Sequence, residues 1–449
     1  MTRLRAIWES VRTTYWAVPS LMSVLAAGLS VAMIHLDEVL TPTFIGTLSW
    51  VYAGGPEGAR AVLSTIAGSM ITVAGVTFSI TIVALTLASQ QFGPRLLRSF
   101  LRDLGNQVVL GTFVSTYIYC LLVLRTVRGN DDAQFVPHLA VTVGVLLAVL
   151  SLGVLIFFIH HVSTSIQASQ IIANVAGDLE GAVVRLFPEM IGQGRAGGTA
   201  SVTALPDGFD RAAQAVPAHS GGYVQAIDEH ALLTLAIERD VVLRIDAEPG
   251  RFARHGTALV SVWPTTSVDH ALCDSVRAAF IIGSARTPTQ DVQFYVEQLV
   301  ELAVRALSPG INDPGTARMC LDRLGQTLCQ MARREMPASR RLDDNGRLRV
   351  MAHPVSFETM AATAFDEIRR YGRSSVSVTV HLLEIIRDVA TCVTRAPDRL
   401  ALLQHTHAII QDSRQTSLGD GDRASVEASH RAALAALQAW APATDLPQE

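Results

Sequence analysis

The sequence predicts an α-helical membrane protein with four transmembrane helices, followed by a cytoplasmic α+β domain that is mostly helical with a small sheet. Three observations predict this fold class. Only 17% of the 449 residues are charged, against about a quarter in soluble domains. Nearly all the long uncharged runs fall before residue 160, and the remainder has an ordinary globular composition. The chain therefore divides into a membrane part and a water-soluble part.

The membrane part, residues 1–160, contains four uncharged runs that are long enough to span a bilayer. A helix needs about 20 apolar residues to cross a hydrocarbon core of about 30 Å. The predicted helices cover about residues 17–36, 61–90, 106–125 and 139–160. A cleaved signal peptide is the alternative for the first run. That run lacks a small-residue cleavage site and leads into Asp37 and Glu38, so we favour an uncleaved anchor.

Arginines near the helix ends predict that both termini lie on the cytoplasmic side of the membrane. The N-terminus and the loop after the second helix are rich in arginine, at Arg3, Arg5, Arg12, Arg95, Arg98 and Arg102. The two opposite loops mix arginine with acidic residues. Positive charge is enriched on the cytoplasmic side, and an even number of spans places the soluble domain there as well.

The second predicted helix carries a stripe of polar residues. The spacing places them on one helix face. The polar members are Thr65, Ser69, Thr72, Ser79, Thr86 and Gln90, and Val76 and Val83 complete the stripe. One interpretation is a water path between several copies of the chain, with Arg95 and Arg98 at a cytoplasmic mouth that favours anions. The other is helix packing through the small-xxx-small pairs Ser64/Gly68 and Gly75/Ser79. Packing is the more common role of such a stripe.

Beyond the membrane part, we expect a helical stalk over 161–190, a linker over 191–220 and the cytoplasmic domain over 221–449. The linker is rich in Gly, Ala, Pro and Ser. Strands are predicted at GGYVQAID and VVLRID, and a turn, a hairpin and a third strand over 249–264. Helices predominate after residue 267, with an exposed hairpin turn at 343–346.

A second candidate site lies between Arg286 and Arg318. The Asp313–Pro314 pair is typical of a helix start, and a polar stripe on the preceding helix could meet Arg286 and Asn312. One interpretation is a site for a small anion or metabolite at the helix N-terminus, and the other is a self-capped turn with structural ion pairs. The candidate ligand-binding residues are Arg286, Asp291, Arg305, Asn312 and Asp313.

Composition and missing motifs exclude several functions. All 36 basic residues are arginine, which excludes lysine Schiff-base chemistry and a phosphate-loop lysine. No catalytic motif is present, so we expect neither enzymatic activity nor a cofactor. The five scattered cysteines suggest neither a metal site nor a disulfide framework. The net charge of -4 gives no reason to expect a nucleic-acid partner. The expected partners are the lipid bilayer, further copies of the chain, and a small anion or metabolite.

Two long motifs resemble a known family. GSMITVAGVTFSITIVALTLASQQFGPRLLRSFLRD and RALSPGINDPGTA, with GYVQAID and PGRFARHGTALVSVWP, are similar to bacterial predicted membrane proteins of the domain of unknown function 2254 family. The resemblance implies the membrane architecture and a location in a bacterial cytoplasmic (inner) membrane, but no reaction and no site residues. The polar stripe, the lack of charged residues inside the spans and the large cytoplasmic domain motivate two hypotheses, ranked ahead of a membrane enzyme that acts on lipid, for which no motif is present. The first is a homo-oligomeric channel or pore with a cytoplasmic regulatory domain, and the second is a membrane-anchored sensor or scaffold.

Overall fold

A computed structural model describes residues 16–39, 51–93, 103–130, 133–165, 167–187, 205–206 and 208–439. The chain divides into two compact units, Met1–Gln170 and Ile171–Glu449.

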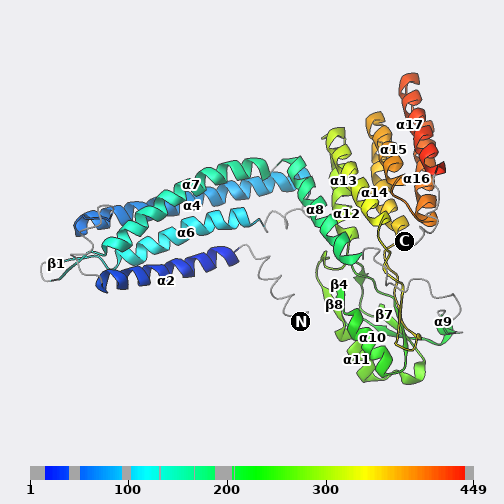
Figure 1. The fold of residues 1–449 in the computed structure, drawn as a ribbon, viewed down its shortest axis with the longest axis horizontal. Coiled ribbons are helices and arrows are strands. Elements are labelled where there is room, and N and C mark those ends of the chain that lie inside the picture. The colour runs from blue at the N-terminus through cyan, green and yellow to red at the C-terminus, as the bar shows by residue number, and fades with distance from the viewer. Residues whose placement is uncertain are drawn as a thin grey trace, which may run out of the picture. The chain divides into compact units, whose positions relative to one another are not determined.

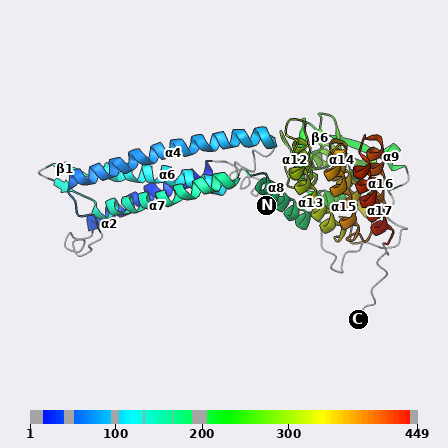
Figure 2. The ribbon, with the colours of Figure 1, turned by 90° about the horizontal axis from the view of Figure 1, so that it is seen from above.

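The first unit is a bundle of four long helices, which run side by side in Figures 1 and 2. They are α2 (Ala17–Val39), α4 (Pro56–Phe92), α6 (Leu104–Leu124) and α7 (His138–Ser165), with a short hairpin of β1 (Arg128–Asn130) and β2 (Ala133–Phe135) between the last two. All four helices are long and apolar enough to cross a membrane. α6 is the central helix, because it packs against each of the other three and most of its residues are buried.

The bundle is apolar both inside and outside. Its interior contains small and aromatic side chains, among them Ala67, Phe113 and Phe158. Most of the exposed large hydrophobic side chains in the described part of the chain belong to these helices, including Leu150 and Leu152 on α7. Such a surface is stable only in a non-aqueous environment, so the bundle has the surface of a membrane domain.

The second unit begins within α8 (Ala168–Leu186) and contains two small sheets with a shared core. The five-stranded sheet has the order β3-β7-β5-β10-β9 and the three-stranded sheet the order β6-β4-β8. The strands are β3 (Gln214–Pro217), β4 (Gly222–Ile227), β5 (Val242–Ile245), β6 (Phe252–Ala253), β7 (Ala258–Trp263), β8 (Phe280–Gly283), β9 (Arg340–Leu342) and β10 (Leu348–Met351). Helices α9 (Phe209–Ala212), α10 (Glu229–Glu238) and α11 (His270–Ala278) complete this region. Leu232, Leu243 and Leu272 lie at its centre, fully buried.

Three helical hairpins form the rest of the second unit. They are α12 (Gln293–Ala306) with α13 (Pro314–Ala332), α14 (Phe357–Gly372) with α15 (Val376–Ala390), and α16 (Ala396–Gln415) with α17 (Asp420–Gln438). α12, α14 and α16 pack in one row, and α13, α15 and α17 in a second row (Figure 1). Each hairpin buries an apolar face against the next one, as in stacked helical repeats.

The predicted fold class is confirmed, since four membrane-length helices precede a mostly helical region with a small sheet. Two local predictions were wrong. Part of the expected linker, Gln214–Pro217, forms β3, because its backbone pairs with β7 and Val216 enters the core. The hairpin expected over 249–264 does not form, because β6 pairs with β4 while β7 pairs with β3 and β5.

Candidate functional site

Helix α4 has two opposite faces, one packed in the bundle and one exposed. The packed face consists of Ala59, Leu63, Ala67, Ala74, Thr77, Thr81 and Ala84, all of which are buried. Successive residues of an α-helix are rotated by roughly 100°, so the predicted polar stripe lies on the other side. Every member of the stripe is exposed: Thr65, Ser69, Thr72, Ser79, Thr86 and Gln90.

The five hydroxyls of the stripe form hydrogen bonds within their own helix. Each donates a hydrogen bond to the backbone carbonyl oxygen four residues earlier, over 2.7 to 2.9 Å. The donors are therefore satisfied, but a hydroxyl oxygen can still accept a further hydrogen bond. Each oxygen can accept one from water or from a donor on another helix.

The small residues of this face make no close contact with any other described residue. No atom lies within 4 Å of the place that a Cβ would take at Gly68 or at Gly75. At Gly144 on α7, by contrast, a Cβ would lie 3.2 Å from Leu63 Cδ2. Close helix contacts inside the bundle thus occur at other glycines, Gly144 and Gly111. Among the described residues, no neighbouring helix packs closely on Gly68 and Gly75 of the predicted packing pairs Ser64/Gly68 and Gly75/Ser79.

The predicted mouth of the water path is only partly described. Gln90 belongs to α4, which ends at Phe92 with Gly93 as its C-cap. Arg95 and Arg98 lie outside the described residues. Their role as an anion-favouring ring stays a prediction.

Polar contacts join the helices at one end of the bundle. The buried carboxylate of Asp37 accepts hydrogen bonds from the backbone N–H groups of Leu139 and Ala140, each over 2.9 Å. It therefore caps the N-terminus of α7, where the first amides have no partner within the helix. His138 Nδ1 lies 2.7 Å from the carbonyl oxygen of Tyr52. In the sequence, Asp37 marks only the end of the first predicted span, and its capping role was not predicted.

A second polar contact joins α6 and α7 away from that end. The Asp103 carboxylate caps α6 by accepting from the Gly105 N–H over 2.8 Å. His161 Nε2 lies 2.6 Å from the same carboxylate. These contacts fix the relative register of two membrane helices, and neither carries an open ligand site.

In the second unit, the structure brings Arg286 and Asp291 together, as the sequence analysis expected. The Arg286 guanidinium donates to Asp291 Oδ2 from Nε over 2.9 Å and from Nη2 over 2.7 Å. It also donates to Glu297 Oε2 over 2.6 Å. Glu297 was not among the predicted residues. Two carboxylates around one guanidinium neutralise it, so this cluster has the character of a structural ion-pair network.

Electrostatics and packing agree with that role. Burial raises the pKa of Asp291, although Arg286 opposes the shift. Burial opposes the charged form of Arg286, but its hydrogen bonds to Asp291 and Glu297 raise the pKa of the guanidinium. Gly250 closes the cluster at positive φ, and a Cβ there would overlap the Asp291 carboxylate. The turn PGRF is therefore shaped to fit the carboxylate.

The GYVQAID strand is tied to the same region by side-chain amides. Gln290 accepts from the backbone N–H of Ile227 over 2.8 Å and donates to its carbonyl oxygen over 2.9 Å. Gln225 donates to the carbonyl oxygen of Ala285 over 2.7 Å. The Gln290 side chain thus pairs with the Ile227 backbone as a neighbouring strand would. Together with Gln225, it positions the segment that leads into α12.

The remaining predicted ligand residues lie at the opposite end of α12. This helix has 14 residues, which corresponds to about 20 Å of length. Arg305 lies 3.9 Å from Glu301. Asn312 adopts a positive φ of 47° in the exposed turn, and Asp313 caps α13 through the Thr316 N–H and hydroxyl. The structure therefore does not bring Asn312 and Asp313 to Arg286.

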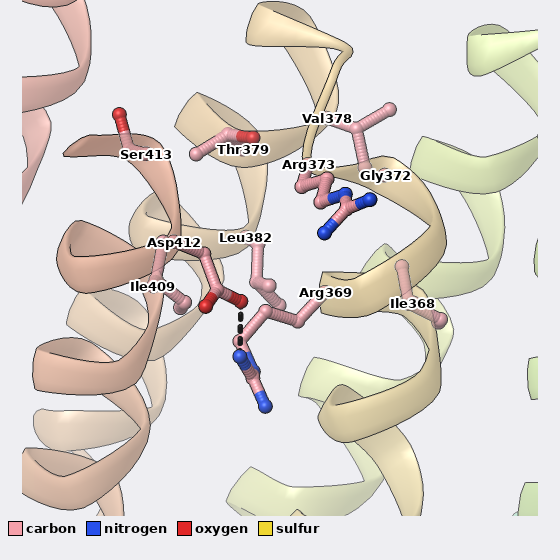
Figure 3. A pocket seen from close by; sticks show the side chains of 10 residues that line it. All are labelled: Ile368, Arg369, Gly372, Arg373, Val378, Thr379, Leu382, Ile409, Asp412 and Ser413. Carbon is pink, nitrogen blue, oxygen red and sulfur yellow. Dashed lines mark hydrogen bonds and ion pairs between the residues drawn. The ribbon is translucent and has the colours of Figure 1, made fainter. Parts of the chain in front are cut away.

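A third polar cluster joins α14 to α16. The Arg369 guanidinium donates a hydrogen bond to the Asp412 carboxylate (Figure 3). His405 is buried, packs edge-on against Phe365 and lies 3.5 Å from Asp366. The cavity beside Arg369 and Asp412 measures only about 10 Å³, which is about the space of one water. This cluster therefore has no room for a metabolite.

The described residues contain no group of three or more His, Cys, Asp or Glu side chains that could hold a metal ion. The expectation that the five cysteines form no disulfide was wrong. Cys329 and Cys392 are paired as a disulfide, with 5.2 Å between their Cα atoms. The stacking of α13 on α15 brings the two positions together across 63 residues of sequence.

Comparison with known proteins agrees with the architecture. The profile of the family described as "Predicted membrane protein (DUF2254)" matches residues 12–388. An uncharacterized protein of Mycobacterium bovis and one of Mycobacterium tuberculosis strain H37Rv are each 33% identical to the chain over 433 residues. Each alignment covers 95% of this chain and 81% of the relative. No solved structure matches the chain.

Proposed function

The chain belongs to the DUF2254 family of predicted membrane proteins, and on that premise we propose that it forms a homo-oligomeric channel or pore lined by α4. The observation that carries the proposal is the exposed polar stripe directly opposite the packed face of α4. The other exposed surfaces of the bundle are dominated by large hydrophobic side chains.

The stripe is better suited to water or protein than to lipid. Five hydroxyl oxygens retain the capacity to accept a hydrogen bond, which hydrocarbon cannot satisfy. Water or the α4 helices of neighbouring copies supply those partners. Gly68 and Gly75 interrupt the large side chains on the same face, which lets a neighbouring backbone approach closely.

A water path, if present, lies between chains. In the described bundle, α6 fills the centre, with Phe113, Tyr119 and Val123 fully buried. A single copy therefore offers no passage along its axis. Several copies arranged around an axis with α4 innermost place the stripe along a common path.

The proposal includes an orientation and a role for the second unit. Arginine placement puts both termini in the cytoplasm, so the second unit faces the cytoplasm and gates or regulates the path. Arg95 and Arg98 then lie at the cytoplasmic mouth and favour anions.

Conductance in planar lipid bilayers tests the proposal. Purified full-length protein is expected to give discrete current steps. Thr72→Val and Ser79→Ala remove hydroxyls without adding bulk, and together lower the unit conductance about fivefold if they raise the barrier by about 1 kcal/mol. The matched control is Leu152→Ala on the outer surface of α7, which leaves the conductance unchanged. Absence of current across voltages and salts overturns the pore.

One observation favours the second candidate, a membrane-anchored sensor or scaffold. The hydroxyls donate to their own backbone, which makes contact with lipid less costly. This candidate predicts that an anionic metabolite raises the melting temperature of the full-length protein, and that Arg286→Gln or Asn312→Ala abolishes the shift. The pairing of Arg286 with two carboxylates does not favour that site. The absence of enzymatic activity stays a prediction.

A further inference from the structure

The disulfide between Cys329 and Cys392 lies on the wall of an open groove in the second unit. Cys329 belongs to α13, and Cys392 follows α15. The groove has a volume of about 740 Å³ and is also lined by Glu180 of α8 and by Gln330 and Arg333. A volume of this size admits small peptides and metabolites, so a thiol from solvent can reach the sulfurs.

The two sulfurs differ in surroundings. Cys329 is partly exposed, whereas Cys392 is buried with 7% of its surface exposed. The Arg333 guanidinium lies 3.5 Å from the Cys392 sulfur. A guanidinium beside a sulfur stabilises the thiolate and makes it a better leaving group. Attack at Cys329 with departure of the Cys392 thiolate is therefore the favoured direction.

Other contacts keep the two cysteine positions close without the disulfide. Arg395 donates to the carbonyl oxygen of Arg334 over 2.9 Å, and Thr394 donates to that of Ala332 over 3.3 Å. These hydrogen bonds hold the segment after α15 against the end of α13. A reduced pair therefore stays in place, and the disulfide can form again.

The remaining cysteines of the second unit, Cys273 and Cys320, are not part of a disulfide on the groove wall. Cys320 is fully buried in α13, and burial raises the pKa of its thiol to about 12. It is therefore unreactive near neutral pH. Cys273 is partly exposed and is not part of a disulfide. These residues serve as internal references for the paired sulfurs.

We propose that Cys329 and Cys392 form a reversible redox site that exchanges with low-molecular-weight thiols entering the groove. A thiolate attacks the Cys329 sulfur, which forms a mixed disulfide and releases the Cys392 thiolate beside Arg333. A second thiolate then attacks the small-molecule sulfur of the mixed disulfide and releases the Cys329 thiolate. In sum, two thiols become one small disulfide, and the protein disulfide becomes two thiols. The reverse reaction with a small disulfide closes the pair.

Reduction changes the groove wall from a neutral disulfide to a thiolate paired with Arg333. Stable structural disulfides are uncommon in the cytoplasm, where thiols are kept reduced. A pair that opens and closes with the thiol pool agrees with the proposed cytoplasmic orientation, although the site does not depend on the pore.

Thiol counting on the full-length protein in detergent tests the site. After treatment with oxidised glutathione, alkylation under denaturing conditions is expected to modify the three unpaired cysteines, Cys120, Cys273 and Cys320. After reduced glutathione acts on the folded protein, all five cysteines are modified. A Cys392→Ser variant retains glutathione on Cys329 after treatment with oxidised glutathione, as an intact-mass increase.

Variants of two arginines, Arg323 within α13 and Arg333 at its C-cap, test the leaving-group argument. Arg333→Gln slows reduction by glutathione about threefold, since it removes the charge beside the Cys392 sulfur. Arg323→Gln, about 15 Å away along the same helix, leaves the rate unchanged. The proposal is overturned if glutathione opens the pair only in unfolded protein, because the disulfide is then a structural link. It is also overturned if both cysteines stay free after treatment with oxidised glutathione.

Discussion

The two units of this protein use the same residue types in opposite ways. In the four-helix unit, leucine, valine and isoleucine cover most of the outside, and the buried Asp37 carboxylate caps the end of α7. In the second unit, leucines fill the core and arginines pair with carboxylates near the surface. The difference shows that the surrounding solvent, lipid or water, decides which face of a helix is stable. Against this background, the polar outer face of α4 is an exception within its own unit.

The largest expected effect comes from adding a charge to exposed leucines of the two units. Leu150 on α7 and Leu400 on α16 are exposed to nearly the same extent, 60% and 57%. Leu150→Arg places a cation in hydrocarbon and is expected to cost about 3 kcal/mol. Leu400→Arg faces water and changes the stability by less than about 0.5 kcal/mol. Unfolding midpoints in lipid nanodiscs measure both.

Equal effects of these two variants on stability would contradict the contrast between a lipid-facing surface on α7 and a water-facing surface on α16. If Leu150→Arg were tolerated as well as Leu400→Arg, the outer surface of α7 would not face lipid, and the bundle would not be a membrane domain.

A smaller effect is expected where the bundle uses polar contacts. Asp37→Ala removes the carboxylate that caps α7 and leaves two backbone amides without their acceptor, at a cost of about 2 kcal/mol. The control is Glu38→Ala, whose exposed carboxylate lies 3.1 Å from exposed His35. It should cost less than about 0.5 kcal/mol. A similar loss of stability in both variants would show that Asp37 is not a specific cap.

The smallest expected effect concerns the buried histidine of the second unit. Burial lowers the pKa of His405, although the Asp366 carboxylate opposes the shift. The unfolded chain therefore binds a proton more readily than the folded chain. The contribution of neutral His405 to the free energy of unfolding is complete above the ordinary histidine pKa of about 6.5. It decreases as the pH falls below that value.

Denaturant unfolding of wild type and variants between pH 5 and pH 8 checks this sign. His405→Gln should flatten the dependence of the unfolding free energy on pH, while His255→Gln, whose side chain is exposed, should leave it as in wild type. An unchanged slope in His405→Gln would assign the pH dependence to other groups.

The membrane architecture could be predicted from the sequence because it depends on run length alone. Each of the four spans is a continuous apolar stretch, and the helices of the structure extend the predicted ones by only a few residues, for example Ala17–Val39 against 17–36. The polar stripe on α4 could also be predicted, because helix periodicity fixes which residues share a face.

The sequence could not reveal contacts between distant segments. Asp37 caps a helix that begins about 100 residues later, and Cys329 meets Cys392 only after two helical hairpins stack. The strand Gln214–Pro217 lies in a region whose composition is typical of a linker, and only its pairing with β7 makes it a strand. The pairing of Arg286 with Asp291 was expected, but the acidic neighbour Glu297 was missed, because nothing in the sequence fixes the direction of the arginine side chain.

Aqueous access to α4 tests the central claim most directly. Leu63 of α4 lies beside Gly144 of α7. Thr72 follows Leu63, and Leu152 follows Gly144, by about the same distance along the helix, so the two test positions lie at a similar depth in the bundle. In full-length protein in native membranes, a charged thiol reagent that cannot cross the bilayer is expected to modify Thr72→Cys rapidly and to leave Leu152→Cys unmodified. If Thr72→Cys is as unreactive as Leu152→Cys, the stripe faces lipid or a dry helix contact, and α4 lines no water path.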